Sequence, residues 1–213
     1  MKKAVLAIFA AVLYSCGGPS EQQAPDEAQG IGGITEDISD IAVSAINDSI
    51  TKTVTSGRFS MEVPAMMHNY SHLDPESEIT YGDTTSGIHL GVYKMGKKEL
   101  SDFVESNDLK SVVTPDLYGY NKLCMANVAN GDNAVEGVKL VSSVTADTSV
   151  VNGMKRIDNS FIIEIDGTDF ETSYVFTEGK DAFYMIYLSM PKAVSDKYDA
   201  LRGKVLGSFR ENQ

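Results

Sequence analysis

The sequence predicts an α+β domain, with a mostly antiparallel sheet flanked by helices, preceded by a signal peptide and a disordered tether. Two turn dipeptides, Asp166-Gly167 and Glu178-Gly179, separate three apolar segments near the C-terminus. Dipeptides of this kind join neighbouring antiparallel strands in hairpins. The last segment, residues 182–190, is apolar on both faces, which is typical of a central strand covered on both sides.

The chain begins with the three parts of a secretory signal. Lys2 and Lys3 give a positive start, residues 4–14 form an uninterrupted apolar run, and Ser15 precedes Cys16. At about 1.5 Å per residue this run spans roughly 16 Å, about half of the hydrocarbon thickness of a bilayer. We therefore predict a signal peptide over residues 1–15 that is removed rather than a permanent membrane span.

The end of this signal, Leu13-Tyr14-Ser15-Cys16, resembles the lipobox of bacterial lipoproteins. The resemblance implies cleavage before Cys16, a lipid thioether on its sulfur and acylation of the new amino terminus. Two or more acyl chains anchor a protein stably. The expected location is the cell membrane or the outer membrane, with the domain exposed outside the cytoplasm, on the periplasmic side or beyond. The alternative is an ordinary signal peptide with an incidental cysteine.

The charge of the chain excludes some partners. Loss of Lys2 and Lys3 takes the formal net charge from −12 to −14. Such an acidic chain lacks the basic surface that nucleic acids require, and anionic headgroups repel it. Membrane attachment is therefore expected to rest on the lipid at Cys16. If Cys16 is acylated, Cys124 is the only remaining thiol, and we predict that it is a buried apolar side chain.

Three segments follow the signal peptide. Residues 16–34 are rich in Gly, Gln, Pro and acidic side chains, so we predict a flexible acidic tether. Residues 35–49 place apolar side chains at helical spacing, which predicts a short amphipathic helix. The folded domain is predicted to cover residues 50–213.

The first half of the domain alternates strands and helices. Residues 50–64 predict a strand pair with a turn at Ser56-Gly57 and an end at Pro64. After a loop, the segments SEITYG and GIHLGVYK predict two strands joined by the turn 83–86. Helical spacing predicts a helix over 97–107 and a second one after Thr114-Pro115. The inward side chains expected in this half are Ile88, Leu90, Val92, Leu100, Phe103, Val104, Leu117, Tyr120, Cys124 and Val128.

The second half predicts four strands and a closing helix. The strands cover residues 134–145, 154–165, 170–176 and 182–190, and the last three should form an antiparallel meander. The closing helix is indicated by apolar side chains spaced by three and four residues. These are Val194, Tyr198, Leu201, Val205 and Phe209.

Several of these segments together resemble the PsbP-like α/β/α sandwich. They are RFSMEVP ending at Pro64, the helix 97–107, SYVF with DAFYMIYLSMP, and KYDALRGKVLGSF near the C-terminus. The family includes the extrinsic subunit of the photosynthetic oxygen-evolving complex, a nuclear import factor and several bacterial lipoproteins. The match covers roughly residues 50–209. Family members mostly serve as binding or assembly accessories without catalysis, and the resemblance implies the same role here, without a cofactor.

One polar segment contains candidate metal ligands. His68 and His72 lie four residues apart, and Asp74, Glu76 and Glu78 follow. On a helix the two imidazoles would share a face and could bind a metal with the carboxylates. The segment lies between two prolines, however, and an exposed polar loop explains it as well. His89 could complete such a site only if the loop folds back.

Signatures of other chemistry are missing from the sequence. There is no G-x-S-x-G motif, no P-loop and no calcium-binding loop. We therefore expect a membrane-anchored, non-catalytic binding or assembly accessory of the bacterial envelope, whose partners are the lipid on Cys16 and an unidentified envelope protein or ligand. The alternatives are a metal-binding lipoprotein that uses His68 and His72, and a hydrolase.

Overall fold

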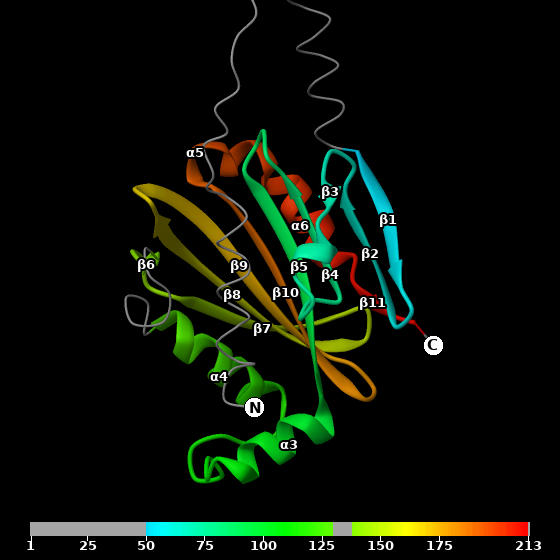
Figure 1. The fold of residues 1–213 in the computed structure, drawn as a ribbon, viewed down its shortest axis with the longest axis vertical. Helices are drawn as coiled ribbons and strands as arrows, with labels where there is room; N and C mark the ends of the chain where they lie inside the picture. The colour runs from blue at the N-terminus through cyan, green and yellow to red at the C-terminus, as the bar shows by residue number, and fades with distance from the viewer. Residues whose placement is uncertain (1–49, 130–137, 213) are drawn as a thin grey trace, which may run out of the picture.

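The computed structural model describes residues 50–129 and 138–212. The predicted signal peptide, Cys16, the tether and the helix over 35–49 lie outside these residues. Within the described residues, eight strands form a large sheet in the order β3-β4-β5-β10-β9-β8-β6, and β7 pairs with β8 beside β6 (Figure 1). The strands are β3 (His68–Asn69), β4 (Ile79–Asp83), β5 (Ile88–Gly96), β6 (Val138–Leu140), β7 (Thr145–Val151), β8 (Met154–Ile165), β9 (Thr168–Glu178) and β10 (Ala182–Pro191).

A smaller sheet covers one face of the large one. It contains β1 (Thr51–Ser56), β2 (Phe59–Pro64) and β11 (Arg210–Glu211), in the order β1-β2-β11. The helices α5 (Lys192–Ser195) and α6 (Asp199–Gly207) belong to the connection between β10 and β11. The helices α3 (Lys97–Ser106) and α4 (Leu117–Ala129) lie on the other side of the large sheet (Figure 1).

Strand β10 is the centre of the fold, as its sequence predicts. It lies between β5 and β9, and every residue from Ala182 to Met190 is buried. Its alternate side chains enter two separate hydrophobic clusters. Tyr184, Ile186 and Leu188 face β2 and α6, whereas Phe183, Met185 and Tyr187 face α3 and α4. Burying one such large side chain contributes about 1.5–3 kcal/mol, so both layers depend on this strand.

The predicted meander is confirmed. Strands β8, β9 and β10 pair antiparallel in sequence order. Asp166 and Gly167 join β8 to β9 with φ angles of 49° and 79°. Two consecutive positive φ angles are typical of the type I′ turn that Asp-Gly favours. The sequence therefore determines the register of this half of the sheet.

Three details differ from the prediction. Within the described residues, the strand expected over 134–145 is only the short β6, because residues 141–144 interrupt the pairing with β8, and the following strand β7 was not predicted. The closing helix is divided into α5, a 3-10 turn over Asp196–Tyr198, and α6. Phe209 follows α6, but it still packs in the core as predicted.

The polar segment after Pro64 is more ordered than an exposed loop. His68 and Asn69 pair with β4, and a 3-10 turn covers Ser71–Leu73. Asp74 is buried. His68, His72 and Glu76 are exposed, as expected of an exposed polar loop, but backbone pairing with β4 draws the segment onto the edge of the sheet.

Candidate binding cleft

Four chain segments meet at one end of the structure and enclose an open cleft with a cavity volume of about 890 Å³. They are the β1–β2 turn, the β7–β8 turn, the β9–β10 turn and the C-terminal strand β11, which lie near the C-terminus in Figure 1. We call this feature the turn cleft. Its lining residues are Gly57, Arg58, Asn152, Met154, Lys180, Asp181, Ala182, Tyr184, Arg210, Glu211 and Asn212.

A tyrosine and a glutamate join two sides of the turn cleft. The Tyr184 hydroxyl donates a hydrogen bond of 3.2 Å to Oε1 of Glu211, and the backbone N–H of Lys180 donates one of 2.7 Å to Oε2. Gly179 makes this approach possible, because a Cβ atom there would lie 2.4 Å from Oε1 of Glu211. The carboxylate of Glu211 is thus already engaged by donors of the protein.

Burial and the neighbouring Glu211 raise the pKa of Tyr184 to about 12. The phenol therefore stays protonated at neutral pH and remains a hydrogen-bond donor. A protonated phenol that already donates to a carboxylate suits a structural or binding role.

The C-terminal strand is fixed against the β1–β2 turn by backbone and side-chain bonds. The N–H of Asn212 donates to the carbonyl of Arg58 at 2.8 Å, and the Asn212 amide donates to the carbonyl of Ser56 at 3.1 Å. Arg210 lies opposite Ser60 in the same ladder. The two arginines of the turn cleft, Arg58 and Arg210, are therefore held on facing chain segments.

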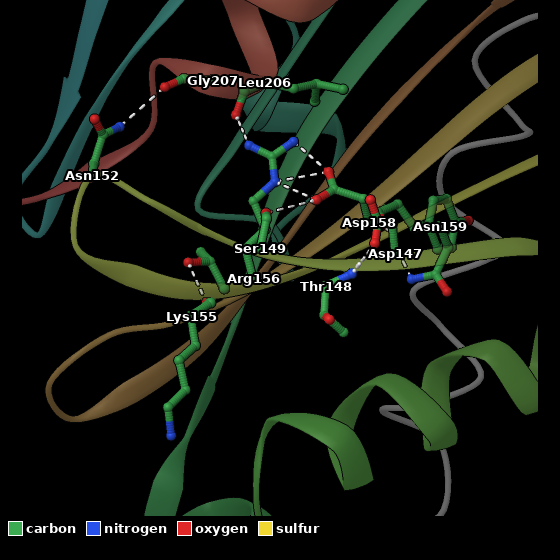
Figure 2. A network of polar contacts seen from close by, with 12 residues as sticks. Asp147, Thr148, Ser149, Asn152, Lys155, Arg156, Asp158, Asn159, Leu206 and Gly207 are labelled. Atoms are coloured by element: carbon green, nitrogen blue, oxygen red, sulfur yellow. Dashed lines mark hydrogen bonds and ion pairs between the residues drawn. The ribbon is translucent and has the colours of Figure 1, made fainter.

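The β7–β8 turn is attached to the end of α6. Asn152 has a φ of 52°, and its amide donates to the carbonyls of Gly207 and Phe209 at 3.0 and 2.8 Å. Arg156 pairs with Asp158 and donates to the carbonyl of Leu206 at 2.6 Å (Figure 2). A cation that binds the last carbonyls of a helix also interacts favourably with its dipole.

The turn cleft contains three cations that are not paired with any residue that the structure describes. Arg58, Lys180 and Arg210 are exposed, and their side chains form no hydrogen bond or ion pair with another described residue. The acidic residues of the cleft are Asp181, which is exposed, and Glu211, which is already hydrogen bonded. The cleft is therefore locally basic on a chain with a formal net charge of −12.

The predicted metal ligands lie elsewhere, and the structure separates them. His68 is exposed on β3, and His72 is exposed on the 3-10 turn. Asp74 is buried and accepts hydrogen bonds from the Tyr93 hydroxyl at 2.6 Å and from the backbone N–H of Glu76 at 3.3 Å. Within residues 50–129 and 138–212, no group of three His, Cys, Asp or Glu side chains is arranged to hold a metal ion.

The strand pairing brings a different pair of histidines into one row. His68 and His89 both lie opposite Gly82, one from β3 and the other from β5. Strand β4 lies between the two histidines, so they are two strand spacings, roughly 9–10 Å, apart. The metal site itself stays a hypothesis.

Cys124 is buried in the cluster beneath α4, as predicted. Burial raises the pKa of its thiol to about 12, against a weaker lowering effect of the hydrogen bond with Tyr120. The thiol therefore stays protonated and unreactive. In the part of the chain that the structure describes, no helix combines the length and the apolar character that crossing a membrane requires.

The turn cleft could not be found from the sequence. Its cations come from positions 58, 180 and 210, and each taken alone is an ordinary charge beside a turn or at a strand end. Their convergence depends on the pairing of β11 with β2 and on the position of the β9–β10 turn, which involve contacts between distant parts of the chain.

The fold and the cleft together define an α+β protein in which a large antiparallel sheet lies between two helices and a second, small sheet. This arrangement confirms the predicted fold class. No family model matches the chain, and no curated protein sequence matches it.

Solved structures with a similar fold do exist. The solution structure of cyanobacterial PsbP (CyanoP) from Synechocystis is 14% identical, covers 86% of this chain and 98% of its own, and has a TM-score of 0.49. LpqN from Mycobacterium tuberculosis, described as involved in cell envelope biogenesis, is 8% identical. It covers 85% of this chain and 100% of its own, with a TM-score of 0.46. A protein from Bacteroides thetaiotaomicron is 10% identical, covers 78% of this chain and 49% of its own, and has a TM-score of 0.42.

Proposed function

We propose that this chain is a lipid-anchored, non-catalytic binding protein of the bacterial envelope, and that it engages its partner through the turn cleft. The lipid on Cys16 holds the domain at the membrane, and residues 16–34 act as a flexible tether between the lipid and the domain. The domain itself supplies the binding surface.

The observation that carries the binding role is the turn cleft, whose three cations form no side-chain bond with any other residue in the described part of the chain. A cleft of this size with a few polar groups is the usual form of a ligand or docking site. Its walls are fixed by Asn152 and Asn212, so the site is pre-organised and loses little conformational entropy on binding. In this proposal the Tyr184 hydroxyl and the Lys180 N–H, which donate to Glu211, stabilise the fold and do not act on a substrate.

The anchoring role rests on residues 1–16. The charge of the chain offers no electrostatic attachment to an anionic bilayer, so removal of the lipid should release the protein. We expect wild-type protein to incorporate labelled fatty acid and to sediment with membranes. Cys16→Ser should lose both properties, whereas Cys124→Ser should keep both. Label retained in Cys16→Ser would contradict the anchor.

The binding role is tested by affinity isolation from membranes with cells that produce tagged full-length protein. A defined partner should be enriched with wild type and lost with the double variant Arg58→Glu/Arg210→Glu. A matched control, Lys98→Glu/Lys192→Glu, makes the same change in net charge outside the cleft and should retain the partner. Equal enrichment with both double variants would place the docking surface elsewhere and overturn the proposal.

A further inference from the structure

Most cations of this protein are already paired with groups of the protein. Lys94 binds Glu78 at 2.8 Å, Lys97 binds Glu178 at 2.8 Å, and Arg202 binds both Glu171 and Asp199. Lys122 donates to a backbone carbonyl at 2.8 Å. The other cations whose side chains bond to a described residue are Lys52, Lys98, Lys110, Lys139, Lys155, Arg156, Lys197 and Lys204.

Four described cations form no such bond, and three of them line the turn cleft. These three are Arg58, Lys180 and Arg210, and the fourth, Lys192, lies outside it. In a chain with 30 acidic and 18 basic residues, an acidic neighbour is the common situation for a cation. Among the described residues, most of the positive charge without a bonded partner therefore lies in the cleft.

The backbone also keeps the two arginines close together. Asn212 faces Arg58 through its N–H, and Arg210 lies two residues before Asn212 on the same strand. Diagonal neighbours on facing strands are about 7–8 Å apart, which is within reach of long side chains. An anionic partner could therefore use the planar donor geometry of both guanidinium groups.

We propose that the turn cleft binds an acidic segment of a partner protein, with Arg58, Arg210 and Lys180 pairing to successive carboxylates. This inference rests on the proposed function and names the chemistry of the partner. One feature favours a protein segment over a single phosphate group. The cations come from separate segments around a wide cavity, so they suit charges spaced along an extended chain.

The test uses purified full-length protein and a fluorescein-labelled hexaglutamate peptide, with fluorescence anisotropy at low ionic strength as the readout. Two surface ion pairs are worth about 0.2–1 kcal/mol each, so Arg58→Gln/Arg210→Gln should weaken binding by roughly two- to thirtyfold. The control Lys98→Gln/Lys192→Gln, with the same net charge, should stay within about twofold of wild type. Arg58 and Arg210 form no side-chain bond with another described residue, and Lys98 loses only an exposed ion pair with Asp102. Both double variants should therefore keep the circular dichroism spectrum of the wild type and a thermal midpoint close to it.

Each remaining outcome decides against the inference. No binding of hexaglutamate, or equal weakening in both double variants, would overturn it. Inorganic pyrophosphate that binds more tightly than the peptide and displaces it would assign the cleft to a phosphate-bearing ligand instead. The result is separable from the proposed function. A partner isolated from membranes that contains no acidic segment would refute only this inference, whereas peptide binding without any isolated partner would refute only the accessory role.

Discussion

The hydroxyl of Tyr93 on β5 donates a 2.6 Å hydrogen bond to Oδ2 of Asp74, a carboxylate that is only 3% exposed. The bond ties the segment after β3 to the middle of the large sheet. Burial is the largest cause that raises the pKa of Tyr93, so the phenol stays a donor. One candidate metal ligand thus belongs to a structural pair inside the protein.

Removing this donor should destabilise the fold. Tyr93→Phe leaves a buried carboxylate without its charge-assisted hydrogen bond, which should lower the free energy of unfolding by about 1–3 kcal/mol. Urea denaturation measures the change. The matched control is Tyr118→Phe, because the Tyr118 side chain is 61% exposed and should lose less than about 0.5 kcal/mol. Equal losses in the two variants would contradict the role assigned to the Tyr93–Asp74 pair.

The attachment of α6 to the β7–β8 turn gives a second prediction. Arg156→Met keeps much of the side-chain volume but removes the side-chain donor of the Leu206 carbonyl and leaves the Asp158 carboxylate with only the Ser149 hydroxyl at 3.4 Å (Figure 2). We expect a loss of about 1–3 kcal/mol in the free energy of unfolding. Lys139→Met breaks only the exposed 3.4 Å pair with Glu164 and should cost no more than about 1 kcal/mol. An Arg156 variant as stable as the Lys139 variant would show that this attachment contributes little.

His89 should make stability depend on pH. Burial lowers the pKa of His89, and Asp83 opposes this effect only in part. Since the folded-state pKa lies below the unfolded value of about 6.5, the unfolded chain binds more protons as the pH falls past 6.5. The free energy of unfolding should therefore fall as the pH decreases from about 7.5 to 5.5.

Chemical denaturation across this pH range tests the assignment. His89→Gln should reduce the slope, whereas His72→Gln, at an exposed position, should leave it unchanged. A slope that persists in His89→Gln and disappears in His72→Gln would contradict the assignment.

Strand β7 carries a charged side chain, Asp147, that protects the edge of the sheet. Among the described strands β7 pairs only with β8, and Oδ1 of Asp147 accepts a 2.8 Å hydrogen bond from the N–H of Thr148. Charged side chains on edge strands discourage pairing with a second chain. Asp147→Val should therefore increase self-association, measured by sedimentation velocity. Thr148→Val adds a similar apolar group without removing the charge and should remain at the wild-type oligomeric state. If both variants associate equally, the carboxylate has no special role.

Local signals in the sequence were sufficient to predict the centre of the fold. Apolar side chains on both faces of residues 182–190 and the Asp166-Gly167 turn correctly predicted the central strand and the meander, because both features are local. Strand β7 was missed because its residues, TADTSVV, are mostly polar and exposed, without the alternation of a half-buried strand. The Asn152-Gly153 turn after it, with φ angles of 52° and 78°, was a usable signal for the β7–β8 hairpin.

The candidate sites were harder to predict than the fold. Spacing suggested that His68 and His72 act together, but a strand and a 3-10 turn hold them, and strand pairing places His68 in a row with His89 instead. The turn cleft depends on residues more than 100 positions apart, such as Arg58 and Lys180. No local sequence pattern therefore predicts it.

The central claim is that the turn cleft is where the partner binds. Photo-crosslinking in cells tests it directly, with p-benzoylphenylalanine placed at Gly57, which lines the cleft, or at Gly203 on α6, which does not. At both positions a Cβ atom would meet nothing within 4 Å, so the two substitutions are matched in cost. Our account predicts an ultraviolet-dependent adduct from position 57 that is absent from position 203. An adduct from position 203 alone would contradict it.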